Sequence, residues 1–106
     1  MDYKVQFDWR TLNRDDPHPA ARVLGGQNGA CMGVTLVVSE HYAAEAAHED
    51  QEGFFVADGH GFALIDGREI AIDENSYLLL PSGTRHCFRK ALGGPDMRLL
   101  WFHASD

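Results

Sequence analysis

The sequence contains few cysteines, and their scarcity narrows the kinds of site that the chain can form. Only Cys31 and Cys87 are present, far apart in the chain, and they fit no paired metal or redox spacing. A cysteine-based zinc or thiol–disulfide motif is therefore excluded. We expect both residues to be free thiols in a reducing compartment, packed as small apolar side chains.

Positive charge is also in short supply. The chain has nine lysines and arginines and sixteen aspartates and glutamates, which gives a formal net charge of −7. The basic residues are scattered along the chain, and only Arg85, Arg89 and Lys90 lie close together. Because phosphate binding needs a concentrated basic surface, we expect no nucleic-acid partner.

Long apolar runs are absent as well. No stretch approaches the roughly 20 residues that a membrane-spanning helix needs, and residues Met1–Arg10 lack the apolar core of a signal peptide. We therefore expect a cytoplasmic protein with no membrane partner. The chain has 106 residues, of which 44% are hydrophobic and 24% charged, as in one ordinary globular domain.

Short β-type runs make up most of what is present. The strongest hairpin signal is Asp66-Gly67, which lies between the runs Phe62–Ile65 and Arg68–Ile72. The other predicted strands are Val34–Val38, Gly53–Ala57, Tyr77–Leu80, Arg85–Arg89 and Met97–His103. Many short strands separated by turns predict an all-β sandwich or barrel.

Two remaining segments are expected to be irregular. Residues His41–Glu49 (HYAAEAAHE) include good helix formers. The segment is short and lies between two predicted strands, and short isolated helices are marginal, so we expect no stable helix there. Residues Asn13–Ala20 (NRDDPHPA) are rich in turn formers and predict a surface loop.

Two short strings carry the residue types from which a metal site is built, HEDQEGFFVADG and LPSGTRHCF. Their key members are His48, Glu52 and Gly59 in the first and Pro81, Gly83 and His86 in the second. With this spacing the chain resembles the cupin superfamily over residues 34–103. That family's first motif is a glycine, five residues, H-x-H, three or four residues, a glutamate, six residues and a glycine. Its second is a glycine, five residues, P-x-G, two residues, a histidine, three residues and an asparagine.

The chain departs from these motifs at four positions. Ala46 stands where the resemblance places the first metal histidine, and this change alters the site itself. The other three are Glu40 and Asn75 at glycine positions and Lys90 at the asparagine position. Loss of a glycine alters a turn, which a barrel can tolerate. The resemblance implies a single double-stranded β-helix, or jelly-roll, barrel in which Gly59, Pro81 and Gly83 shape turns.

Strand alternation predicts what the barrel interior contains. Side chains alternate between faces, so Glu52, Phe54 and Val56 share one face of a strand. His86 and Phe88 share a face of a later strand, and we expect both sets to point inward. Phe54, Val56 and Phe88 are then the candidate walls of a substrate pocket.

His48, Glu52 and His86 are the candidate metal ligands. Inward polar groups in an apolar cavity are costly unless a cation or hydrogen bonds satisfy them. Two imidazoles and one carboxylate with open positions suit a single divalent iron, zinc, nickel or manganese ion. Glu52 is also the candidate catalytic base, because a carboxylate in an apolar cavity tends to have a raised pKa.

The alanine at position 46 leaves several alternatives open. Glu45 could replace the missing histidine if a bulge turned it inward, and His41 could do so through irregular backbone. A water molecule at the vacant position is the simpler expectation. Alternatively, the barrel has kept its fold and lost its metal. His18, His60 and His103 are expected to be surface or loop histidines, His103 with at most an indirect part in the site.

Two functions follow from the resemblance. Single-domain cupins include dioxygenases, isomerases, epimerases, decarboxylases and lyases. We therefore expect a metal-dependent enzyme, a dioxygenase or isomerase among the candidates, acting on a small organic molecule. The alternative is a metal-free cupin that serves as a small-molecule binding or sensing module.

The N-terminal third is predicted to extend the barrel rather than to form a second domain. Residues 1–33 are expected to supply strands and a loop that pack on the barrel, residues 34–106, or on a dimer partner. Tyr3–Trp9 is the candidate open edge strand that could pair with a second subunit. We expect a homodimer with twofold symmetry, the commonest closed assembly.

Overall fold

The computed structural model describes residues 3–104, and strands dominate this part of the chain. A 3-10 turn, η1 (Trp9–Thr11), precedes them. The strands are β1 (Ala20–Gly25), β2 (Cys31–Val37), β3 (Gln51–Asp58), β4 (Gly61–Ile65), β5 (Arg68–Ile72), β6 (Tyr77–Leu80), β7 (His86–Lys90) and β8 (Met97–Ala104). Every strand predicted between residues 34 and 103 is present, with ends that differ by a few residues. No helix in the described residues is long and apolar enough to cross a membrane.

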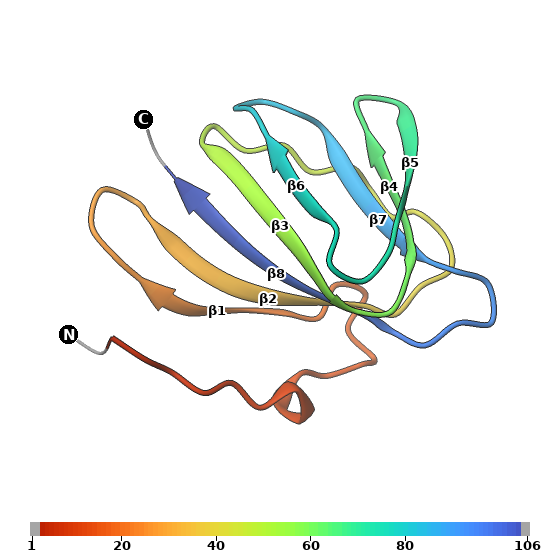
Figure 1. The fold of residues 1–106 in the computed structure, drawn as a ribbon, viewed down its shortest axis with the longest axis horizontal. Coiled ribbons are helices and arrows are strands. Elements are labelled where there is room, and N and C mark those ends of the chain that lie inside the picture. Colours follow the sequence, from red (N-terminus) through yellow and green to blue (C-terminus); the bar gives the residue numbers. More distant parts are fainter. Residues whose placement is uncertain (1–2, 105–106) are drawn as a thin grey trace.

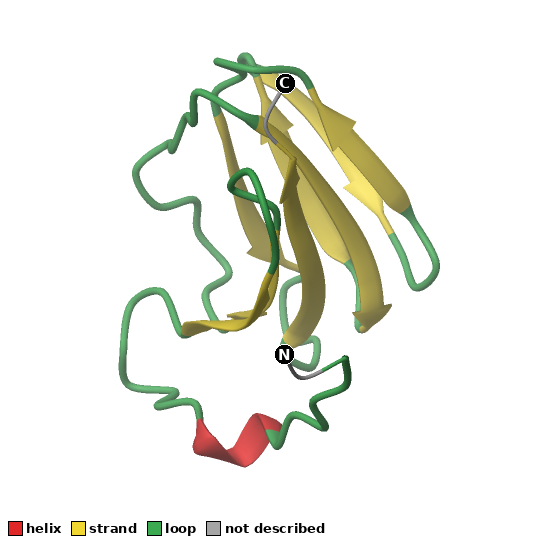
Figure 2. Ribbon diagram, turned by 90° about the vertical axis from the view of Figure 1, so that its left-hand side faces the viewer, coloured by secondary structure: helices red, strands yellow, loops and turns green. Residues whose placement is uncertain are grey.

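The strands form two antiparallel sheets, which Figures 1 and 2 show from two sides. The larger sheet has the order β1-β2-β8-β3-β6, and the smaller has the order β5-β4-β7. The C-terminal strand β8 therefore lies between β2 and β3, far from both in sequence. The prediction of an all-β jelly-roll fold is confirmed.

The core lies between the sheets and follows the predicted alternation. On β3, Glu52, Phe54 and Val56 are buried, whereas Ala57 is exposed. On the neighbouring β8, Met97 and Leu99 are fully buried at alternate positions. The inward face of each strand thus carries the apolar side chains, whose removal from water stabilises the fold.

Turns are built where the chain has residues that tolerate a positive φ. Gly59 and Gly83 have φ values of 82° and 80°. Asn75, which occupies a glycine position of the second motif, also has a positive φ of 72°. Asparagine enters this region more readily than most residues, so it can replace the glycine without loss of the turn. Asp66 and Gly67 both have positive φ, as a type I′ hairpin requires.

The N-terminal segment differs from the prediction. Tyr3–Trp9 is not an edge strand: residues 3–8 are irregular and lead into η1. One edge of the larger sheet is instead β1, a strand not predicted individually, which pairs with β2. The residues that follow this segment contact the barrel through an ion pair and a cation–π contact. Arg14 donates to Asp96, with 2.8 Å between Nη2 and Oδ1, and the guanidinium of Arg98 lies 5.0 Å from the centre of the Trp9 ring.

Candidate metal centre

One end of the barrel holds a pocket of about 490 Å³. Its walls come from β2, β3, β7 and β8, from the loop after β2, and from the start of β1 with the segment before it. Most of the lining is apolar, with Phe54 and Phe88 among the aromatic members. The polar exceptions include Glu52, His48, His86 and His103. A cavity of this size with few, converging polar groups is typical of a small-molecule site.

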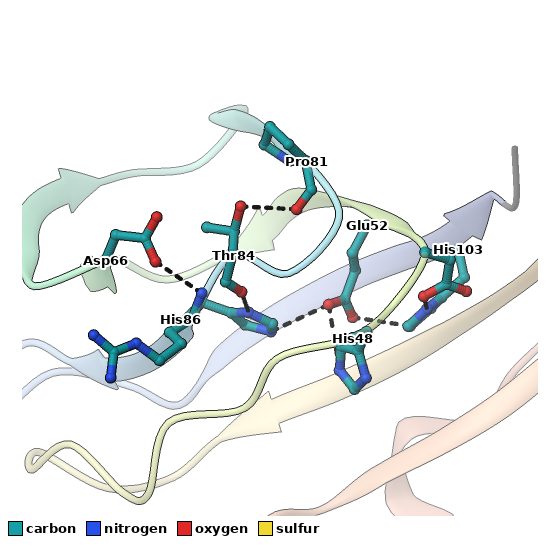
Figure 3. Close-up of polar contacts among 9 residues, drawn as sticks. His48, Glu52, Asp66, Pro81, Thr84, His86 and His103 are labelled. Atoms are coloured by element: carbon teal, nitrogen blue, oxygen red, sulfur yellow. Dashed lines mark hydrogen bonds and ion pairs between the residues drawn. The ribbon is translucent and has the colours of Figure 1, made fainter.

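Three imidazoles converge on one buried carboxylate in this pocket (Figure 3). Glu52 is only 6% exposed. Its Oε1 atom lies 3.1 Å from Nε2 of His86 and 3.5 Å from Nε2 of His48. Its Oε2 atom lies 2.9 Å from Nε2 of His103. Although Oε1 is close to two imidazoles, neither contact has hydrogen-bond geometry, so this buried oxygen has no donor within the described residues.

Strand pairing explains why these side chains meet. Glu52 lies near the start of β3, directly opposite His103 on β8. His86 is the first residue of β7, on the other sheet, and follows a turn in which the Thr84 hydroxyl donates to the carbonyl of Pro81 at 2.7 Å. His48 comes from the loop before β3, and its carbonyl accepts a hydrogen bond from the Gly83 amide at 2.8 Å.

In two of the imidazoles, the ring nitrogen that points away from Glu52 donates a hydrogen bond to an oxygen atom. Nδ1 of His86 lies 3.0 Å from the carbonyl oxygen of Thr84, and Nδ1 of His103 lies 3.0 Å from Oδ1 of Asp50. A carbonyl or carboxylate can only accept, so Nδ1 of each ring carries the hydrogen. In the neutral ring the lone pair is then on Nε2, which faces Glu52. This is the arrangement in which protein histidines bind metal ions.

Neighbouring groups in the site shift the pKa values of His86 and Asp50. Burial alone would lower the pKa of His86, but the Glu52 carboxylate and the Thr84 carbonyl outweigh it and raise the pKa above its usual value. The hydrogen bond from His103 holds the pKa of Asp50 below that of an ordinary aspartate. Asp50 is therefore an ionised acceptor at neutral pH, which keeps the hydrogen of His103 on Nδ1.

The structure brings the three predicted ligands together but changes their surroundings. His48, Glu52 and His86 share the pocket, and Phe54 and Phe88 lie in its walls. Val56 is not among the lining residues, because it is completely buried in the apolar core. The interior around Glu52 was expected to be largely apolar, and most of the pocket lining is, but the imidazole of His103 joins those of His48 and His86 beside its carboxylate. The motif residues Gly59, Pro81 and Gly83 lie in turns, as predicted.

His103 is the residue that sequence reasoning placed wrongly. It was expected at the surface, yet its side chain is only 15% exposed and its Nε2 atom contacts Glu52. One signal for this position was present in the sequence. Met97, Leu99 and Trp101 alternate along β8, and His103 continues that inward-facing series by one more step.

Neither of the predicted substitutes for the missing histidine joins the cluster. Ala46 pairs with His86 through two backbone hydrogen bonds of 2.9 Å and lies in the pocket wall. Glu45 instead lies 3.7 Å from the guanidinium of Arg85. His41 belongs to the pocket wall but is exposed. Among the described residues, the group of metal-binding side chains with ligand atoms within 4.8 Å of one another is His48, Glu52 and His103.

Comparisons with known proteins agree with this architecture. The sequence model of the cupin domain family matches residues 33–103. A search of curated protein sequences finds no match. Among solved structures, the plu4264 protein from Photorhabdus luminescens is similar over the whole chain and 89% of its own length, with 16% identity and a TM-score of 0.78.

Two enzymes are also among the similar structures. An Fe(II) form of HppE in complex with its substrate is 14% identical, over 80% of this chain and 52% of that one, with a TM-score of 0.73. A salicylate 1,2-dioxygenase from Pseudoaminobacter salicylatoxidans, in complex with gentisate, is 15% identical over 81% of this chain and 24% of that one, with a TM-score of 0.69. This chain thus spans about half of the first enzyme and a quarter of the second, and the likeness concerns the fold.

Proposed function

This chain belongs to the cupin family, and from that membership and its pocket we propose that it binds one divalent metal ion and acts on a small organic molecule. His48, Glu52 and His86 are the proposed ligands. The observation that carries the proposal is the buried Oε1 atom of Glu52, which has no hydrogen-bond donor although imidazole nitrogens lie 3.1 and 3.5 Å away. A buried carboxylate oxygen left unpaired is costly, and a cation would remove that cost.

The chemistry of the donor set fits a divalent cation. Imidazole nitrogens and a carboxylate oxygen together suit iron, zinc, nickel or manganese. His86 is held by the Thr84 carbonyl so that its Nε2 lone pair faces Glu52. The names of the similar structures include an Fe(II) enzyme and a dioxygenase, which supports iron as one candidate without selecting it.

The rest of the pocket would bind and orient the substrate. Phe54 and Phe88 supply apolar walls, and their ring centres lie 4.9 Å apart in an edge-to-face contact. They would exclude water from one side of a bound molecule. A bound ion would supply Lewis-acid polarisation of an oxygen-bearing substrate. Glu52 would either help to hold that ion or, in the alternative predicted from the sequence, accept a proton from the substrate.

Metal content tests the proposal directly. Wild-type protein expressed without added metal, or reconstituted afterwards, is expected to contain about one equivalent of a single divalent metal. His86→Ala removes one ligand and should weaken metal affinity by at least about tenfold, since loss of even a supporting residue costs roughly 10–100-fold. Less metal should therefore remain bound through purification. Elemental analysis of the purified proteins measures both values.

An exposed histidine outside the pocket provides the control. His60→Ala should retain the wild-type metal content, since His60 lies at the surface between β3 and β4. A metal-free wild type after reconstitution, or equal metal in wild type and His86→Ala, would overturn the proposal.

The competing function is a metal-free module that binds a small molecule. Ala46 favours it, because the resemblance places a metal histidine there and the structure has a methyl group in the pocket wall. Under this reading, ligand binding would be unaffected by a chelator. The same elemental analysis separates the two functions.

A homodimer is the proposed assembly, and the outer face of the larger sheet supports it. Strand register places two rows side by side there, Met32–Phe102–Gly53–Leu79 and Leu100–Phe55–Tyr77. Neither row contains a charged residue, in a chain that is 24% charged, and most of these apolar side chains are exposed. A second copy suits this face because an uncharged surface avoids repulsion between two chains of net charge −7.

Light scattering tests the assembly. We expect the mass of a dimer for wild type and of a monomer for Phe102→Lys, which would bury a charge in the contact. Arg68→Lys, on the other sheet, is the control and should remain dimeric. A monomeric wild type at about 100 µM, well above the micromolar Kd of a weak complex, would contradict this assignment.

A further inference from the structure

His103 has the contacts of a metal ligand, although it lies outside both motif strings. Its position opposite Glu52 in the β3–β8 pairing directs its ring into the pocket, where its Nε2 atom is 2.9 Å from Oε2 of Glu52. Its side chain is 15% exposed, compared with 42% for His48. The better-buried of these two histidines is therefore the one that the sequence motif does not include.

Asp50 sets the orientation of the His103 ring. Its Oδ1 atom accepts from Nδ1 of His103 at 3.0 Å, so the neutral ring has its lone pair on Nε2. That lone pair faces Oε2 of Glu52, which is also an acceptor. Two acceptors 2.9 Å apart repel unless a proton or a cation lies at the contact. A carboxylate behind a histidine is a common support for a metal-bound imidazole.

The same arrangement recurs on the other side of Glu52. Thr84 holds the hydrogen of His86 on Nδ1, so Nε2 of His86 also presents a lone pair to the carboxylate. The two rings come from different sheets, β7 and β8, and each has its own backbone or carboxylate support. Support of this kind is typical of histidines that bind a metal ion.

We propose that His103, oriented by Asp50, is a further ligand of the cation and provides the imidazole that Ala46 cannot. Ala46 keeps its place through its backbone pairing with His86, but a methyl group cannot coordinate. The ligand atoms of His48, Glu52 and His103 lie within 4.8 Å of one another. Two ligands on opposite sides of one ion are at most about 4.4 Å apart at bond lengths of about 2.2 Å, so small side-chain shifts would let a single ion bind all three. This proposal rests on the proposed metal function.

Cobalt(II) titration of the full chain tests it without any assay of activity. Visible absorption reports the coordination of the ion, and competition with a chelator reports its affinity. His103→Ala should lower the affinity by more than about 100-fold and change the absorption spectrum, whereas Asp50→Asn should lower it by roughly 10–100-fold. His60→Ala, an exposed histidine outside the pocket, is the matched control and should bind like wild type.

The outcomes separate this proposal from the one on which it rests. If His103→Ala binds cobalt with wild-type affinity and spectrum while His86→Ala does not, His103 is not a ligand and the metal function stands. If the wild type binds no cobalt, the metal function itself fails.

A second measurement uses wild-type protein alone and so does not depend on the folding of any variant. In wild-type protein titrated with zinc, long-range ¹H–¹⁵N correlation spectra resolve the ring nitrogens of each histidine. We expect Nε2 of His103 to move to the metal-bound range while Nδ1 keeps its hydrogen. A His103 ring unchanged by zinc, with His86 shifted, would overturn the assignment.

Discussion

Glu52→Gln is expected to remove the metal and leave the metal-free fold at least as stable as wild type. Glutamine has the size of glutamate but no charge, so it neither neutralises nor firmly binds a divalent cation. Metal content should fall from about one equivalent to below about 0.1, in line with the sensitivity of metal sites to their ligands. The stabilisation that bound metal confers on wild type should disappear with it.

Without metal, the same substitution should leave the free energy of unfolding unchanged or raise it. In wild type with neutral imidazole rings, a buried carboxylate faces the lone pairs of two imidazoles, and its Oε1 atom has no donor. A glutamine amide can donate to those nitrogens, so we expect the free energy of unfolding with chelator to be unchanged or about 1 kcal/mol higher. Urea unfolding with chelator and with metal measures both effects.

A neighbouring carboxylate serves as the control for this experiment. Glu49→Gln removes an equal charge from an exposed position and should change neither metal content nor stability appreciably. Retention of a full equivalent of metal by Glu52→Gln would contradict the ligand assignment. A marked loss of stability in chelator would show that the carboxylate serves the fold itself.

Gly61→Ala is expected to cause the largest loss of stability among single changes that add one methyl group. An added Cβ would lie 2.2 Å from the carbonyl oxygen of Arg89 and 2.8 Å from Cα of Lys90. Both are backbone atoms of β7, which pairs with β4 at this position. The strands can make room only by separating, so we expect a cost of about 3 kcal/mol in the free energy of unfolding.

Gly67→Ala isolates conformational strain from this steric clash. Gly67 has a positive φ of 79° in the hairpin, but nothing lies within 4 Å of an added Cβ. Only the left-handed backbone opposes the substitution, at about 1 kcal/mol. Urea unfolding of both variants gives the comparison. Equal or greater destabilisation by Gly67→Ala would mean that the contact between β4 and β7 is looser than the structure has it.

The local features of the fold were readable from the sequence. β-Branched and apolar runs predicted the strands from β2 to β8, and Asp66-Gly67 predicted the hairpin between β4 and β5. The inward face of β3 followed from alternation alone. These features depend on neighbouring residues in one chain segment, so a linear pattern carries them. The prediction of an edge strand at Tyr3–Trp9 was wrong, because apolar residues near a terminus do not specify a pairing partner.

The candidate site could be predicted only in part from the sequence. The sequence determined that His48 and Glu52 lie close together, since three residues separate them, and the family motif indicated His86. Tertiary structure alone decided that His103 lies opposite Glu52, that Val56 belongs to the core and that Glu45 lies beside Arg85. Each of these depends on how segments far apart in sequence pair with one another. Closure of the whole barrel sets the register of that pairing, because a shift by one residue would turn every inward side chain outward.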